Sequence, residues 1–241
     1  MTLPLFRDDA YLITTEAVVT AINEAGGIVL DQTIFYPTGG GQPGDNGWLT
    51  MADGTEIAIV TAVKGETPDE IVHVPAEGST LPDIGSPVDI EIDWKTRHRY
   101  MRMHSCLHLL SAVLPYPVTG GQVSDGKGRL DFDLPEATLD KEKITTALNQ
   151  LVAEGHSLSS DWISEEELDA KPELVKTMSV QPPRGNGRIR LVKVGDIDLQ
   201  PCGGTHVRNT SEIGPVRVRK IEKKGRQNRR VSLIFDDETT G

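Results

Sequence analysis

Two short stretches of the sequence carry metal-ligand residues at spacings that constrain how the chain folds. Residues 96–114 read TRHRYMRMHSCLHLLSAVL, and residues 201–206 read PCGGTH. If the first stretch is a helix, its apolar residues form one stripe that packs on a core: Tyr100, Met103, Leu107, Leu110 and Leu114. His104 and His108 stand one turn apart beside this stripe, so both imidazoles can reach a single ion. Cys106 is rotated by about 200° from His104, and we expect its sulfur to point away from that ion.

The second stretch supplies the remaining ligands. Cys202 and His206 are separated by Gly203, Gly204 and Thr205, a spacing of C-x3-H. The glycines favour a loop, which can fold a thiolate and an imidazole back onto one point. One cysteine and three histidines form a ligand set suited to Zn2+. The sequence therefore predicts a zinc site of His104, His108, Cys202 and His206.

Simpler interpretations apply to each half of this site taken alone. A histidine beside a core face is usually a hydrogen-bonded packing residue, and an isolated C-x3-H carries little information. The presence of both halves in one short chain favours metal binding. Four protein ligands describe a closed structural zinc, whereas a catalytic zinc keeps a position for water. Catalysis would need a fifth position to open or one ligand to leave, and ligand counting does not decide between these.

Length and cysteine content bound the class of protein. A chain of 241 residues can hold one large domain or two small ones. With only two cysteines, no disulfide framework is possible, which favours a reducing cytoplasm. The N-terminus lacks a basic region followed by an apolar one, and no run reaches the ~20 apolar residues of a membrane span. We expect a soluble cytoplasmic protein without a membrane partner.

The first part of the chain has the pattern of β structure. Short apolar and β-branched runs separated by turn residues predict five or six strands of a small β-barrel: Ala17–Ile22, Gly27–Phe35, Glu56–Val63, Ile71–Val74 and Pro87–Trp94. From Trp94 the pattern becomes helical. We therefore expect a barrel domain over residues 1–94 and a second domain over residues 95–241.

One loop in the barrel domain is unusually rich in glycine. Residues 36–47 read YPTGGGQPGDNG and follow a predicted strand. Because Pro43 and Gly44 prevent a helix from following directly, the loop is neither a nucleotide-hydrolase phosphate loop nor a dinucleotide fingerprint. Three adjacent glycines allow a ligand to approach the backbone closely, and Gln42 offers both a donor and an acceptor. An ordinary long hairpin loop is the simpler alternative.

The second domain is predicted to be α+β, with two main helices on a largely antiparallel sheet. After the histidine-bearing helix, a second helix is expected over Leu139–Glu154, ended by Gly155. Ser164 and Glu167 form a capping box for a short third helix. The remaining patterns predict strands: Gln122–Ser124, Arg129–Phe132, Gly187–Val194, Val216–Glu222 and Arg230–Phe235.

A basic strip lies between the last two predicted strands. Residues 217–230 carry eight Lys or Arg and one Glu, although the whole chain has a formal charge of −11. A basic strip on an acidic body can steer a polyanion to one place. A solvated charged hairpin is the alternative.

Three separated motifs resemble those of the free-standing alanyl-tRNA editing proteins, the AlaX family. They are Arg102…His104-x3-His108-Leu-Leu, the loop Cys202-Gly-Gly-Thr-His206, and the Phe-Tyr-Pro-x-Gly-Gly-Gly-Gln-Pro-Gly-Asp run that ends at Asp45. The same elements are similar to the editing domain of alanyl-tRNA synthetase, and the zinc half is similar to that of threonyl-tRNA synthetase. The length resembles the medium-length class. Where many relatives have Thr-Ala between the histidines, this chain has Ser105 and Cys106, which we expect to point away from the metal and to alter packing.

The resemblance implies a function and a set of site residues. Such proteins hydrolyse the ester of wrongly charged tRNA, so we expect a zinc-dependent aminoacyl-tRNA deacylase acting in trans on Ser-tRNA(Ala), and on Gly-tRNA(Ala). Gly39, Gly40 and Gly41 would line the pocket for the 3′-terminal aminoacyl-adenosine, and Gln42 would position water. Thr33 would accept the serine hydroxyl and reject alanine. The basic strip would bind tRNA phosphates through the following residues: Arg219, Lys220, Lys223, Lys224 and Arg226.

Two other functions remain open at this point. A different zinc hydrolase would be expected to carry His-Glu-x-x-His, but Ser105, Cys106 and Leu107 occupy that gap. A non-catalytic tRNA-binding module with a structural zinc would bind tRNA without deacylating it. The sequence leaves the oligomeric state open, and a monomer is compatible with it.

Overall fold

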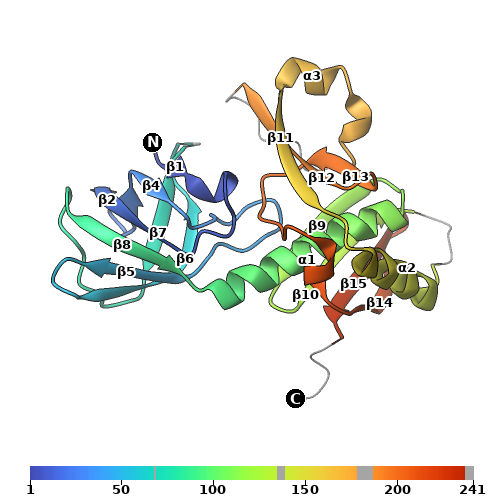
Figure 1. Ribbon diagram of the computed structural model, residues 1–241, viewed down its shortest axis with the longest axis horizontal. Helices are drawn as coiled ribbons and strands as arrows, with labels where there is room; N and C mark the ends of the chain where they lie inside the picture. Colours follow the sequence, from blue (N-terminus) through green and yellow to red (C-terminus); the bar gives the residue numbers. More distant parts are fainter. Residues whose placement is uncertain (68, 135–138, 178–186, 237–241) are drawn as a thin grey trace. The chain divides into compact units, whose positions relative to one another are not determined.

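The computed structural model describes residues 1–67, 69–134, 139–177 and 187–236, and it divides into two compact units, 1–99 and 100–241 (Figure 1). The division falls inside helix α1, Trp94–Val113, whose first residue is also the last residue of the predicted barrel domain. Among the described residues, no helix is both long and apolar enough to cross a membrane.

The first unit contains the predicted small barrel. Six antiparallel strands close in the order β2-β3-β7-β6-β5-β8. Their bounds are β2 Thr14–Ile22, β3 Ile28–Leu30, β5 Gly47–Met51, β6 Glu56–Lys64, β7 Ile71–Pro75 and β8 Pro87–Ile92. Strand β8 alternates between exposed and buried residues along its whole length, so one face of each pleat fills the barrel.

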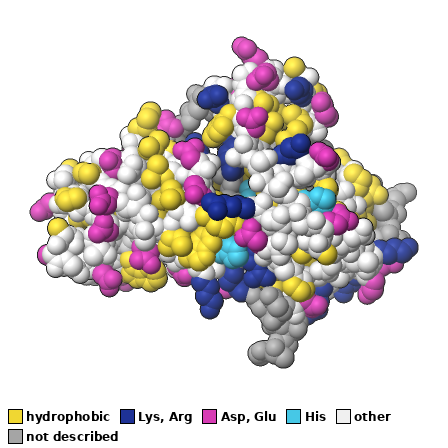
Figure 2. All heavy atoms as spheres, in the orientation of Figure 1, with side chains coloured by type: hydrophobic (Ala, Val, Ile, Leu, Met, Phe, Trp, Pro, Cys, Tyr) yellow, Lys and Arg dark blue, Asp and Glu magenta, His cyan; other side chains and the backbone are white. Residues whose placement is uncertain are grey.

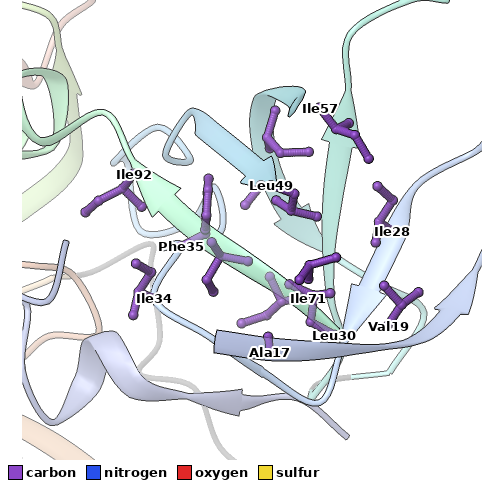
Figure 3. Packing of buried hydrophobic residues seen from close by; sticks show 14 of the residues in the cluster. Ala17, Val19, Ile28, Leu30, Ile34, Phe35, Leu49, Ile57, Ile71 and Ile92 are labelled. Atoms are coloured by element: carbon purple, nitrogen blue, oxygen red, sulfur yellow. The ribbon is translucent and has the colours of Figure 1, made fainter. Parts of the chain in front are cut away.

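The core of the first unit consists mainly of branched aliphatic side chains, together with aromatic ones such as Phe35. Figure 3 shows Ile28, Leu30, Phe35, Leu49 and Ile57 pointing into the same interior from different segments, and all are at most 1% exposed. Burial of such side chains supplies most of the stability of a domain of this size.

The sequence prediction of one strand over Gly27–Phe35 is wrong in its length. The segment divides into β3 and the short strand β4, Gln32–Thr33, which pairs in parallel with β1, Leu3–Pro4. The break lies at Asp31, whose carboxylate accepts the backbone N–H groups of Val18 and Gln32 in place of a ladder bond. A single 3-10 turn, Leu5–Arg7, follows β1.

Strand β5 was not predicted, because its first residue belongs to the glycine-rich run. Gly47 pairs with both Ile59 and Ile92. A Cβ at this position would lie 2.1 Å from the carbonyl oxygen of Glu91. This glycine therefore lets two strands approach closely instead of forming a turn.

The second unit is α+β, as predicted. A four-stranded antiparallel sheet has the order β14-β15-β10-β9, and a three-stranded one has the order β11-β12-β13. The strands are β9 Val118–Ser124, β10 Lys127–Asp133, β11 Leu158–Ser164, β12 Arg188–Val194, β13 Asp198–Pro201, β14 Val216–Lys224 and β15 Asn228–Phe235. The helical segments are α1, α2 Lys141–Glu154, α3 Glu165–Asp169 and the 3-10 turns Pro172–Leu174 and Thr210–Ile213.

The helix ends follow the predicted signals. Gly155 closes α2 in the left-handed conformation with φ +69°, and Ser164 with Glu167 forms the capping box of α3. Helix α2 begins two residues later than predicted because Asp140 accepts the first free N–H groups as its N-cap. Strands β11 and β13 were not predicted.

Helix α1 is buried on more of its faces than a single apolar stripe predicts. Every residue from Met103 to Ser111 is buried. Gly128 of β10 allows this approach, since a Cβ there would lie 2.8 Å from the sulfur of Met103. Arg102, part of the first motif, donates to the carbonyl of Ile213 and lies 4.1 Å from the centre of the Phe235 ring. These two contacts join α1 to other parts of the second unit.

The acidic charge of the chain is concentrated in the barrel unit. Residues 1–99 contain five Lys or Arg and sixteen Asp or Glu, while residues 100–241 contain twenty of each. On the face shown in Figure 2, the surface of the first unit accordingly carries acidic side chains over its strands, whereas both signs mix on the second. The excess of negative charge therefore lies on the barrel unit, and the charges of the second unit balance formally.

Candidate metal centre

The structure brings the four predicted metal ligands together in the second unit. His104 and His108 project from α1, and Cys202 and His206 come from the loop that follows β13. One potential ligand atom from each residue lies within 4.8 Å of the others. Cys106 is fully buried and is not a member of this group, as predicted, and burial raises the pKa of its thiol to about 12.

The spacing of the donor atoms fits a tetrahedral zinc ion. The Sγ atom of Cys202 lies 3.5 Å from Nε2 of His104 and 3.3 Å from Nε2 of His206. Ordinary Zn–S and Zn–N bonds at a tetrahedral angle place such atoms about 3.6 Å apart. One thiolate and three imidazoles also match the softness of zinc, so these residues fit the ion that the sequence predicts.

The electrostatics of the site prepare two of the ligands for a metal. Burial alone would raise the pKa of the Cys202 thiol, but the rings of His104 and His206 hold it well below its ordinary value. Burial, together with His104, lowers the pKa of His206 to about 3. A thiolate and a neutral imidazole are the forms that bind metal ions. The backbone N–H of Gly204 also points to the sulfur, at 3.5 Å.

A buried polar network holds the ring of His108. Its Nδ1 lies 2.8 Å from a carboxylate oxygen of Asp198, which also accepts from Gln200 at 2.8 Å. Lys176 donates to the other oxygen of Asp198. Burial would lower the pKa of His108, but the hydrogen bond to Asp198 and the neighbouring Cys202 raise it to about 9. The pKa of Asp198 falls to about 2 because His108 and Lys176 outweigh the effect of its burial.

The ring of His206 is held by Ser105. The hydroxyl oxygen of Ser105 lies 3.1 Å from Nδ1 of His206 and accepts the backbone N–H of Val207 at 3.2 Å. We expected Ser105 to point away from the metal and to alter packing more than chemistry, but its hydroxyl contacts Nδ1 of a predicted metal ligand. Ser105 is adjacent to His104 in sequence, but its side chain reaches His206, the predicted ligand that comes from the loop.

Sequence reasoning also missed Asp198 and Gln200. They are buried, while Leu199 between them is exposed. In a strand, residues 198, 200 and 202 lie on one face, so this strand turns its polar residues inward together with Cys202. The available signal was the presence of two polar residues at alternating positions, four and two residues before the predicted metal ligand Cys202.

The glycine-rich loop has a defined conformation in the first unit. The backbones of Gly39 and Gln42 bond to each other in both directions, at 2.9 and 3.1 Å. Gly40 and Gly41 between them have φ of +55° and +82°, which favour glycine. At Gly44 a Cβ would lie 2.1 Å from the carbonyl oxygen of Ala62. The glycines of this run are therefore needed for a tight hairpin turn and a close backbone approach.

The end of the loop is anchored by a buried ion pair. Asp45 accepts from the backbone N–H of Tyr36 and from Nε and Nη2 of Arg97, at the start of α1. The guanidinium of Arg97 is fully buried and also donates to the carbonyls of Ala10 and Ile34. A buried charge is stable only with such complete pairing.

The two other predicted substrate residues of this unit are buried. Thr33 is fully buried, and its hydroxyl lies 2.7 Å from Nε2 of His73 and accepts the backbone N–H of Phe35. His73 in turn bonds to the carbonyl of Ile28 through Nδ1. Gln42 is 1% exposed. Thr33 therefore has a structural role in the barrel, and the roles of both residues toward a substrate stay predictions.

The basic strip forms the β14–β15 hairpin of the second unit. The five predicted tRNA-binding residues are all exposed: Arg219, Lys220, Lys223, Lys224 and Arg226. A β-bulge between Val218 and Lys220 explains the imperfect alternation of the sequence. Lys220 and Lys224 pair with Glu222, whereas the other three form no ion pair with any described residue.

Two family models match the chain. Residues 189–232 match the second additional domain of threonyl and alanyl tRNA synthetases, and residues 10–96 match class II (A) tRNA synthetases. The first match covers Cys202, His206 and most of the basic hairpin, and the second covers the barrel. Together with the His/Cys cluster, these matches define a protein of the synthetase editing-domain type.

Curated relatives extend the similarity over the whole chain. The AlaX-M alanyl-tRNA editing protein of Methanosarcina mazei is 34% identical, covering 100% of this chain and 99% of the relative. That of Pyrococcus horikoshii is also 34% identical, over 98% and 99%. The alanine–tRNA ligase of Aeropyrum pernix is 34% identical over 89% of this chain and 24% of the ligase. The chain belongs to the AlaX family of alanyl-tRNA editing proteins, in its medium-length class.

Proposed function

We propose that the protein hydrolyses the ester bond of misacylated tRNA(Ala), removing serine and also glycine, with a zinc ion held by His104, His108, Cys202 and His206. The convergence of these four side chains within 4.8 Å carries the proposal. The names of the full-length relatives, alanyl-tRNA editing proteins, support the substrate class.

The residues present suit ester hydrolysis. An aminoacyl ester is labile, so a site needs to orient a water molecule and to stabilise the developing negative charge. A zinc ion in this site supplies a Lewis acid for the ester carbonyl. The four ligands would hold that ion. Asp198 contacts the ring of His108 and Ser105 contacts the ring of His206. In this proposal Gln42 orients water, and Gly39, Gly40 and Gly41 line the pocket for the aminoacyl end.

Rejection of alanine requires a hydrogen-bond partner for the serine hydroxyl. A site built to bond that hydroxyl rejects the analogue lacking it more strongly than a pocket rejects one methylene. Thr33 is the proposed selector, although its hydroxyl already meets His73 and Phe35. Thr33→Val tests this assignment: a selector variant cleaves Ala-tRNA(Ala) and Ser-tRNA(Ala) at more similar rates. An unchanged ratio with reduced stability would leave Thr33 with its structural role alone.

The β14–β15 hairpin is proposed to bind tRNA phosphates. Charge reversal at Lys223 and Lys224 should weaken tRNA binding and reduce its salt dependence by about one unit of slope per lost phosphate contact. Lys141→Glu, an exposed position at the start of α2, is the matched control. An unchanged slope would assign the hairpin to solubility.

A second function is favoured by the ligand count. Four protein ligands form a closed set of the kind found in structural zinc sites, so a tRNA-binding module without catalysis is the runner-up. It predicts that the wild-type protein binds aminoacyl-tRNA without hydrolysing the aminoacyl ester. It also predicts that folded His104→Ala protein still binds tRNA.

The deciding experiment compares three substrates. Ser-tRNA(Ala), Gly-tRNA(Ala) and Ala-tRNA(Ala) are incubated with the purified protein, and metal content is measured on the same preparation. The proposal expects hydrolysis of the first two, slow hydrolysis of the third and one zinc per chain. Binding without hydrolysis of any of the three would support the module instead.

A further inference from the structure

Two of the three imidazole rings in the predicted metal site make a buried hydrogen bond through Nδ1. Nδ1 of His108 meets Asp198, and Nδ1 of His206 meets Ser105. All four of these residues are at most 8% exposed. In a neutral imidazole, a hydrogen on Nδ1 leaves the lone pair on Nε2. Nε2 of His206 is the atom that approaches Cys202, at 3.3 Å.

We propose that Asp198 and Ser105 are positioning residues that hold His108 and His206 with Nε2 directed at the ion. The proposal rests on the proposed metal site and adds residues outside its ligand set. A partner on the second nitrogen fixes both the tautomer and the rotation of a ligand ring, which strengthens metal binding.

Asp198, which contacts His108, accepts several further hydrogen bonds. Oδ2 of Asp198 accepts from His108 and from Gln200, whose amide also reaches Ser111 at 3.2 Å. Oδ1 of Asp198 accepts from Lys176. The backbone carbonyl of Lys176 is fixed in turn by the N–H of Val118. Both oxygens of the carboxylate are therefore engaged, and its orientation is determined by the fold.

Asparagine cannot reproduce this arrangement. With its oxygen toward His108, the amide group of Asp198→Asn would face the ammonium of Lys176, and two donors would meet. With the amide reversed, it would face Nδ1–H of His108 and the amide of Gln200. A carboxylate is the group that satisfies all three donors at once, since it only accepts hydrogen bonds.

The hydrogen bond between Ser105 and His206 is expected to be weaker than the one between Asp198 and His108. Ser105 is neutral, and its oxygen accepts both from His206 and from the N–H of Val207. A neutral hydrogen bond contributes less than one to a charged group. Ser105→Ala should therefore weaken metal binding less than Asp198→Asn. Ser105→Thr keeps the hydroxyl and should restore binding.

The test measures zinc affinity of the full-length chain by competition with a chromophoric chelator. Asp198→Asn should weaken binding by roughly 10- to 100-fold, and Ser105→Ala by on the order of 5-fold. Asp196→Asn is the matched control, since it makes the same change at an exposed carboxylate of the same β12–β13 turn, and it should match the wild type. Ser105→Thr should lie within about twofold of the wild type.

A second readout separates positioning from folding. In zinc-loaded protein labelled with 15N-histidine, His108 and His206 should show a protonated Nδ1. The Nδ1–H signal of His108 should shift in Asp198→Asn, and that of His206 in Ser105→Ala. If Asp198→Asn does not fold, the zinc affinities of Ser105→Ala and Ser105→Thr test the positioning role.

The outcomes distinguish the inference from the proposed metal site. If the wild type binds zinc but the Asp198 and Ser105 variants match it in affinity, the positioning role is overturned and the site stands. Protonated Nε2 atoms in the loaded wild type would also overturn the positioning role. If the wild type binds no zinc, the metal site itself fails.

Discussion

A buried histidine in the barrel makes the stability of the first unit depend on pH. His73 is fully buried, with Nδ1 3.0 Å from the carbonyl of Ile28 and Nε2 2.7 Å from the hydroxyl of Thr33. Burial lowers its pKa from 6.5 to about 4, against the opposing effect of the Ile28 carbonyl. The folded protein therefore keeps this ring neutral at pH values where the unfolded chain protonates it.

The sign and size of the effect follow from proton linkage. Between pH 6.5 and about 4 the unfolded state binds more protons, so the stability is complete above pH 6.5 and declines as pH falls through this window. The full difference in pKa corresponds to about 3 kcal/mol, and the part lost between pH 7 and pH 5 is about 2 kcal/mol.

Urea denaturation of the wild type and of His73→Leu at pH 7, 6 and 5 measures this contribution. The variant is less stable at pH 7 because the Ile28 carbonyl and the Thr33 hydroxyl lose their partner. Its stability should nevertheless fall by about 2 kcal/mol less between pH 7 and 5 than that of the wild type. His98→Asn, at a half-buried histidine of the same unit, should retain the wild-type decline. Equal declines for the wild type and His73→Leu would refute the reasoning.

Two further predictions concern the glycine-rich loop and its anchor. Asp45→Asn leaves the guanidinium of Arg97 buried without its carboxylate, and should reduce the free energy of unfolding by about 3–5 kcal/mol in a denaturant titration; a loss below 1 kcal/mol would contradict the assigned pairing. Gly44→Ala places a methyl 2.1 Å from a backbone oxygen and should lower the unfolding free energy by about 3 kcal/mol or more. Gly54→Ala, at a position with φ +86° and open space around it, should lower it by only about 1–2 kcal/mol; equal losses for the two variants would contradict the close backbone approach assigned to Gly44.

The cluster of four potential metal ligands could be predicted because each half of it is local in sequence. The i, i+4 pair on a helix and the C-x3-H loop each define one half of a ligand set, and the chemistry of zinc joins them. The barrel could be predicted as well, because its strands alternate with a period of two and are separated by turn residues. The caps of α2 and α3 follow from Gly155, Ser164 and Glu167, which act on adjacent backbone groups.

The missed features depend on contacts between distant segments. The hydroxyl of Ser105 reaches His206, 101 residues away, and no local pattern shows this contact. Strand β13 was hidden because its inward residues are polar, which reverses the usual alternation. Strand β5 was hidden because Gly47 permits strand packing where a glycine usually indicates a turn.

Zinc K-edge X-ray absorption of the purified protein tests the central claim most directly. The account predicts one zinc per chain with one sulfur at about 2.3 Å and three nitrogens at about 2.0 Å. In Cys202→Ser the sulfur contribution should disappear, whereas in Cys106→Ser it should remain. A zinc shell without sulfur in the wild type, or no stoichiometric zinc, would contradict the claim that residues 104, 108, 202 and 206 bind one ion.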